Sequence, residues 1–65
     1  MKEEEFVTLK LIVGQLILIH LRNGGIICGS YQGNFNSSTA AFEVENHRTN
    51  QVETVEIESI NEVVV

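Results

Sequence analysis

The sequence predicts a mostly β protein: a five-stranded, strongly bent antiparallel barrel that follows a short N-terminal helix. Short runs rich in β-branched residues are separated by glycines or polar segments, as in small all-β domains. Asn23-Gly24 stands between the first two apolar runs, and this dipeptide is the strongest short-range signal for a hairpin. The chain has no proline and only 65 residues, so we expect a single domain that spans residues 1–65.

The N-terminal segment, residues 3–13, is open to two interpretations. Three glutamates at its start suit the positive end of a helix dipole. Phe6, Leu9 and Val13 also fall at a spacing that forms one apolar helix face. The β-branched residues of the same segment favour instead a strand that runs into the next element. We expect the helix.

The first hairpin is predicted from residues 15–22 and 26–34. Both faces of its first strand carry apolar side chains, so we expect one face to pack in the barrel interior. The other face is expected to lie under the N-terminal helix or a neighbouring subunit. Gly29 and Gly33 are interpreted as points where the second strand bends, because glycine inside a strand often marks a bulge or a barrel corner.

Three further strands are predicted at residues 39–45, 52–58 and 60–65, with a polar loop at residues 46–51. The final strand ends in three consecutive valines. An unpaired strand edge of this composition is an aggregation hazard unless another chain covers it. We therefore expect copies of the chain to pair edge to edge and close into a homo-oligomeric ring. The expected subunit interface comprises Val55, Ile57, Val63, Val64 and Val65.

The small size of the chain supports self-association. A domain of this length buries only about 60% of the surface that its unfolded chain exposes. The single cysteine, Cys28, excludes an internal disulfide and a cysteine zinc cluster. His20 and His47 show no metal-ligand spacing with the glutamates, so we expect neither a metal nor a cofactor. Oligomerisation remains as the expected source of additional stability.

Composition argues against several classes of function. The formal net charge is −5, and four Lys and Arg residues are too few for a broad nucleic-acid grip. The chain contains no aspartate and no glycine-rich phosphate loop, so we do not expect an enzyme. Its acidic start is unlike a secretory signal peptide, and its apolar stretches are too short to span a bilayer. We expect a cytoplasmic protein that does not enter membranes.

The spacing of the glycines resembles the first motif of the Sm-like family, which includes Sm, LSm and Hfq proteins. Gly14 is followed by alternating apolar residues, then by Asn23-Gly24 and Gly29. Residues 55–64 are similar to the second motif, in the Hfq version that ends Ile-x-x-Val-Val. The resemblance implies an SH3-like barrel of the Sm type. It also implies a ring of about five to seven copies that binds single-stranded RNA or acts as an RNA chaperone.

The resemblance also indicates candidate RNA-binding residues. The family's uridine-binding Asp/Asn pair falls on Phe35 and Thr39, and a gap would move the match to Asn34 or Asn36. His20 stands where Hfq carries an aromatic residue that helps to bind adenine-rich RNA. Each position has a structural alternative: Phe35 as a core or interface aromatic, the asparagines as turn residues, and His20 as a strand histidine at a subunit contact.

The chain departs from the family at the pore. Where the second motif carries Arg-Gly, or Lys-His in Hfq, this sequence has Glu56-Ile57 or Ile57-Glu58. A glutamate at this place repels phosphate. Two functions follow: a ring that binds RNA through bases stacked near Phe35, or a protein-interaction or scaffold ring that has lost the RNA site. The glutamates of the third and fourth strands are interpreted as a solvated face, with a cation-binding pore as the alternative.

Overall fold

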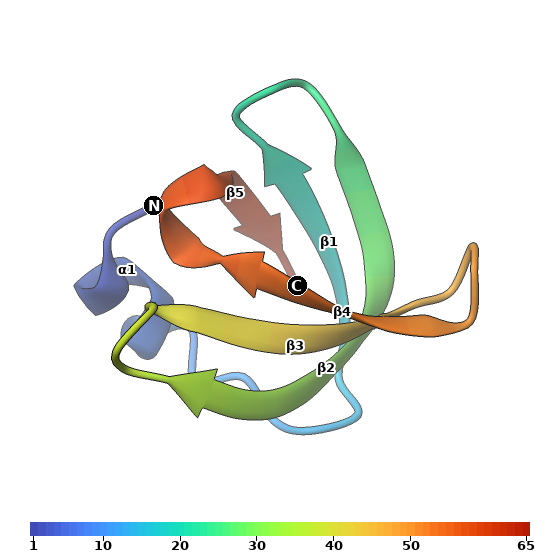
Figure 1. Cartoon of the computed structure of the whole chain (residues 1–65), viewed down its shortest axis with the longest axis horizontal. Coiled ribbons are helices and arrows are strands. Elements are labelled where there is room, and N and C mark those ends of the chain that lie inside the picture. The colour runs from blue at the N-terminus through green and yellow to red at the C-terminus, as the bar shows by residue number, and fades with distance from the viewer.

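The computed structural model describes residues 1–65 and confirms a mostly β chain with a short N-terminal helix. The elements in chain order are α1 (Glu3–Thr8), β1 (Leu16–Leu21), β2 (Ile26–Asn36), β3 (Ala41–Asn46), β4 (Gln51–Glu56), the 3-10 turn η1 (Ile57–Ser59) and β5 (Ile60–Val64) (Figure 1). All five strands belong to one antiparallel sheet. A short helix followed by five antiparallel strands is consistent with the resemblance to Sm-like proteins.

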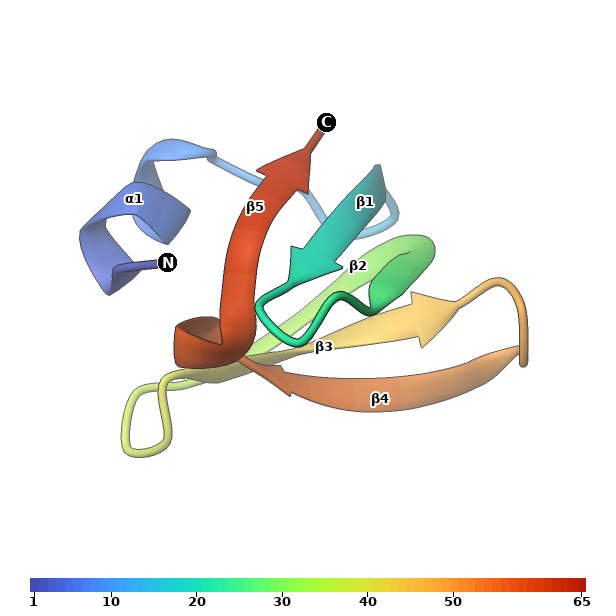
Figure 2. The ribbon, with the colours of Figure 1, turned by 90° about the horizontal axis from the view of Figure 1, so that it is seen from above.

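The sheet is open, with the strand order β4-β3-β2-β1-β5. β4 and β5 follow each other in the chain, yet they form the two opposite edges of the sheet. The reason is that η1 redirects the chain after Glu56, so that β5 pairs with β1 (Figure 2). No ladder joins β4 to β5. The open sheet corrects our expectation of a strongly bent barrel within a single chain.

The expected N-terminal helix is present, but it ends at Thr8. At its start the backbone amide of Lys2 donates to Glu5 Oε1 at 3.0 Å, as in the reciprocal half of a capping box. At its end Lys10 adopts the left-handed conformation with a φ of 51°, which terminates the helix. The apolar face predicted for residues 3–13 is therefore cut short. Phe6 is buried, whereas the side chain of Val13 is 63% exposed.

The hairpin predicted from Asn23-Gly24 is confirmed. β1 ends at Leu21 and β2 begins at Ile26, with regular antiparallel pairing between the two strands. The backbone amide of Leu21 donates to the Gly25 carbonyl at 2.8 Å. Asn23 Oδ1 accepts from the Gly25 amide, and Gly24 has a φ of 92°, a conformation that glycine adopts at no steric cost.

The two glycines within β2 have different roles. The register between β2 and β3 shifts on both sides of Gly33, which has a φ of 77°, so this glycine marks an irregularity as predicted. Gly29 pairs in regular register with both β1 and β3, so the bend predicted there does not involve a bulge. A Cβ atom at Gly29 would lie 2.0 Å from the Glu45 carbonyl oxygen. Gly29 is required because β3 passes unusually close to β2.

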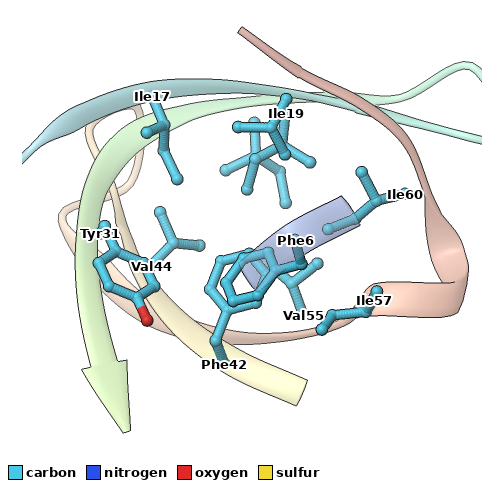
Figure 3. Close-up of a cluster of buried hydrophobic side chains, with 11 residues drawn as sticks. Phe6, Ile17, Ile19, Tyr31, Phe42, Val44, Val55, Ile57 and Ile60 are labelled. Atoms are coloured by element: carbon cyan, nitrogen blue, oxygen red, sulfur yellow. The ribbon is translucent and has the colours of Figure 1, made fainter. Parts of the chain in front are cut away.

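The hydrophobic core lies on the inner face of the sheet, and α1 packs over it. The rings of Phe6 and Phe42 stack with centroids 4.7 Å apart, and Tyr31 packs at an angle to both (Figure 3). The remaining core residues come from all five strands and η1: Ile17, Ile19, Ile27, Val44, Val55, Ile57, Ile60 and Val63. α1 thus contributes one large side chain, which closes the core on the side that the open sheet leaves uncovered.

Substitution of Gly29 by alanine is expected to destabilise the protein. The added Cβ would collide with backbone atoms of β3, which cannot rotate away as a side chain can. We expect the free energy of unfolding to fall by about 2–4 kcal/mol, measured by urea denaturation. Gly25→Ala is the matched control, because its Cβ would meet only side-chain atoms, Asn23 Oδ1 at 3.0 Å and Leu21 Cδ1 at 3.3 Å. Equal stability of the two variants would contradict the close approach of β3.

Substitution of Ala40 by glycine is expected to stabilise the protein. Ala40 has a φ of 50° in the turn between β2 and β3, a conformation that costs alanine about 1–2 kcal/mol. Glycine removes this strain but loses more entropy on folding, so we expect a net gain of about 0.5–1 kcal/mol. The control is Ala41→Gly, which removes a buried methyl group from β3 and should be destabilising. A decrease in melting temperature for Ala40→Gly would contradict the turn geometry.

Candidate interaction surfaces

The two edge strands carry backbone groups with no partner in the chain. β4 pairs only with β3, and the Ile57 amide donates to the Ala40 carbonyl at 2.8 Å at the end of this ladder. Hydrogen-bonded and non-hydrogen-bonded residue pairs alternate along an antiparallel ladder. Val52, Thr54 and Glu56 therefore direct their backbone N–H and C=O groups away from β3. These groups form a strand edge that is open to pairing with another chain.

The residues predicted for the subunit interface divide into two groups. The side chains of Val55, Ile57 and Val63 are buried in the core of their own chain, so they are not available as an outer contact surface. Val64 and Val65 are exposed, and the side chain of Val65 is 68% exposed. The backbones of Val55 and Ile57 are also engaged, because Val55 faces β3 in the ladder and the Ile57 amide donates to the Ala40 carbonyl.

An apolar cluster, here called the outer face, lies on the sheet surface opposite the core. It comprises Leu16 and Leu18 of β1, Ile26 and Cys28 of β2, and Val64 of β5. Leu18 lies opposite Cys28 on one side and opposite Val64 on the other. The side chain of Leu16 is 64% exposed, so no other part of the chain covers this face. Of the two covers expected for the second face of β1, α1 is excluded because it packs on the core, and a neighbouring subunit stays a prediction.

Four predicted RNA-binding residues lie together at the end of β2 and in the turn that follows. Phe35 is 38% exposed, and one face of its ring lies against Phe6 with a centroid distance of 6.0 Å. Asn34 Nδ2 donates to Glu43 Oε1 at 2.7 Å, and Asn36 Oδ1 accepts from a backbone amide of the turn. Thr39 is exposed in this turn. Both asparagine side chains are thus engaged within the chain.

His20 does not join this group. It lies near the end of β1, where its neighbours across the sheet are Ile26, the first residue of β2, and Glu62 of β5. Phe35 lies near the last residue of β2, an eleven-residue strand. The structure therefore places His20 beside the outer face and separates it from the other predicted RNA-binding residues by the length of β2.

Positive charge is dispersed over the molecule. Lys2 and Lys10 flank α1, Arg22 lies in the turn between β1 and β2, and Arg48 lies in the turn between β3 and β4. Glu56 and Glu58, at the end of β4 and in η1, are both exposed. No basic patch forms at the positions where the family resemblance implies a positively charged pore.

The structure reveals one polar pair that sequence reasoning missed. Ser30 Oγ and His47 Nε2 lie 2.7 Å apart, and the backbone amide of His47 donates to the Cys28 carbonyl at 3.0 Å. His47 is exposed in the polar loop that the sequence predicts, and these two bonds attach the turn between β3 and β4 to the outer side of β2. The pair joins residues 17 positions apart, so no local sequence pattern indicates it.

The second missed feature is a groove of about 240 Å³ between α1 and β2. Its walls are formed by Phe6, Val7, Lys10, Leu11, Tyr31 and Phe35. Five of these six side chains are hydrophobic, and Lys10 is the only charged one. The groove depends on how α1 packs against β2, which the spacing of residues within either segment does not determine.

No group of three or more His, Cys, Asp or Glu side chains is placed to hold a metal ion. The structure also contains no helix of the length and hydrophobicity needed to span a bilayer.

Comparison with protein-family models, with curated proteins and with solved structures finds no match for this chain. The resemblance to Sm-like proteins therefore rests on the motif residues of the sequence and on the order of the helix and strands.

Proposed function

We propose that this chain is a self-assembling interaction module of the Sm type, in which β4 of one copy pairs with β5 of the next. The observation that carries the proposal is the placement of two consecutive strands at opposite edges of one open sheet. A contact between two different edges is heterologous, and it generates a ring when the rotation between copies closes.

The chemistry of the two edges supports this pairing. Val52 of β4 and Val64 of β5 are exposed β-branched residues at the edges, and burial of such apolar surface stabilises an assembly. The charge on the edges is acidic, with Glu56 on β4 and Glu62 on β5. Like charges directly opposite each other destabilise a strand pair. The edges therefore favour a register in which these two glutamates are not neighbours.

Thr54→Pro is the variant that tests edge pairing. The backbone N–H of Thr54 points away from β3, so proline removes a donor from the edge while the ladder with β3 keeps its hydrogen bonds. We expect the wild-type chain to form oligomers and Thr54→Pro to form monomers, as measured by native mass spectrometry. The control variant Thr54→Ala, which keeps the N–H, should retain the oligomer. A wild-type protein that remains at 7.3 kDa at micromolar concentration would overturn the proposal.

Binding of single-stranded RNA is the second candidate function, and the exposure of Phe35 favours it. Phe6 occupies one face of the Phe35 ring, which leaves the other face for a nucleobase. Stacking of a base on an aromatic side chain contributes about 1–3 kcal/mol and does not depend on the base. The net charge of −5 and the dispersed cations oppose this function, because phosphate contacts supply most of the non-specific affinity.

The RNA hypothesis predicts saturable binding of fluorescent U-rich or A-rich oligonucleotides that weakens as salt is raised. Phe35→Ala should reduce the affinity about tenfold if a base stacks on this ring. Arg48→Gln is the control for charge remote from Phe35, and it should change the affinity less than Phe35→Ala does. Absence of binding at concentrations of tens of micromolar would exclude the RNA hypothesis. Of the two proposed functions, only the interaction module would then remain.

A further inference from the structure

The groove between α1 and β2 combines an apolar interior with a cation at one end. Phe6 and Val7 of α1 form one wall, and Tyr31 and Phe35 of β2 form the other. Lys10 follows the end of α1 and is exposed. Because Lys10 is the only charged residue of the lining, the groove has a defined polarity: an apolar part against β2 and a positive group beside it.

The volume of the groove fits a small molecule. Its volume of about 240 Å³ lies below the range of about 300–1,000 Å³ that is usual for drug-sized ligands. An apolar cavity of about 150 Å³ is sufficient to bind one benzene molecule. The groove therefore has room for one aromatic ring, or an aliphatic chain of similar size, with one small polar substituent.

Charge determines the nature of that substituent. The side chain of Lys10 attracts an anion, and a carboxylate can accept a charge-assisted hydrogen bond from its ammonium group. Glu3 lies one helical turn before Phe6 and Val7, on the same side of α1, so an anion is repelled from that end of the groove. The negative group of a ligand is therefore favoured only at the end marked by Lys10.

We propose that this groove binds a small amphipathic carboxylic acid. Its aromatic or short aliphatic body lies among Phe6, Tyr31 and Phe35, and its carboxylate lies at Lys10. The site does not depend on the proposed ring, because every residue that lines it comes from one chain. It would make the module responsive to a small organic acid through contacts that involve α1.

The experiment uses phenylacetate and its neutral counterpart phenylacetamide, each titrated into the ¹⁵N-labelled 65-residue chain and followed by NMR. We expect phenylacetate to shift signals of α1 and of the second half of β2. The expected dissociation constant is on the order of 1 mM, as is usual for so small a ligand. Phenylacetamide should bind at least threefold more weakly because it lacks the charge. Acetate, which lacks the apolar body, should cause no shifts in these segments.

Two exposed positions provide the variants, so loss of folding does not confuse the result. Lys10→Gln should weaken phenylacetate binding about threefold and leave phenylacetamide binding unchanged. Val7→Glu should weaken phenylacetate binding about tenfold, because it places a carboxylate in the lining. Arg48→Gln, which is remote from the groove, is the matched control and should have no effect. Equal binding of the acid and the amide, insensitivity to Lys10→Gln, or absence of shifts in α1 and β2 would each overturn the proposal.

Discussion

The packing of Phe6 on Phe42 is the contact on which the rest of the structure depends. An open five-stranded sheet leaves one side of its core uncovered, and the ring of Phe6 closes that side. The same ring also contacts Tyr31 and Phe35, so it positions the wall of the groove and covers one face of the most exposed aromatic residue. A six-residue helix has little stability of its own, so α1 is held in place by tertiary contacts, in which Phe6 is its only buried residue.

The short length of the chain leaves its sheet unevenly covered. One face is covered by the core and α1, whereas the outer face around Leu18 remains exposed. The edges are likewise unpaired at β4 and β5. These 65 residues provide enough apolar side chains for one core layer, and the apolar residues left exposed on the outer face mark a candidate interaction surface. This asymmetry underlies the proposal of self-assembly.

The sequence predicts best those features that local chemistry determines. The hairpin at Asn23-Gly24 follows from turn geometry, and the strands follow from runs of β-branched residues. The end of α1 at Thr8 was not predicted, because it depends on the left-handed backbone of Lys10. The open sheet was also missed, since whether β4 meets β5 depends on the path of the chain through η1 and not on either strand.

Site residues were harder to predict because their contacts depend on how separate strands pair, and local chemistry does not determine that pairing. The cluster at Asn34, Phe35 and Asn36 is local, because these residues are consecutive in β2. The engagement of Asn34 with Glu43 depends on the pairing of two strands, which a motif does not reveal. Alternation along β1 also places His20 opposite the core, beside an apolar surface that becomes apparent only when three strands lie side by side.

Tyr31 gives the protein an unusual optical property. It is the only tyrosine, and the chain has no tryptophan, so one phenol ring supplies nearly all of the near-ultraviolet absorbance and emission. This ring lies in contact with both Phe6 of α1 and Phe42 of the sheet. Its fluorescence therefore reports on the seam between helix and sheet without any label, and it distinguishes detachment of the N-terminal segment from loss of the sheet as followed by far-ultraviolet circular dichroism.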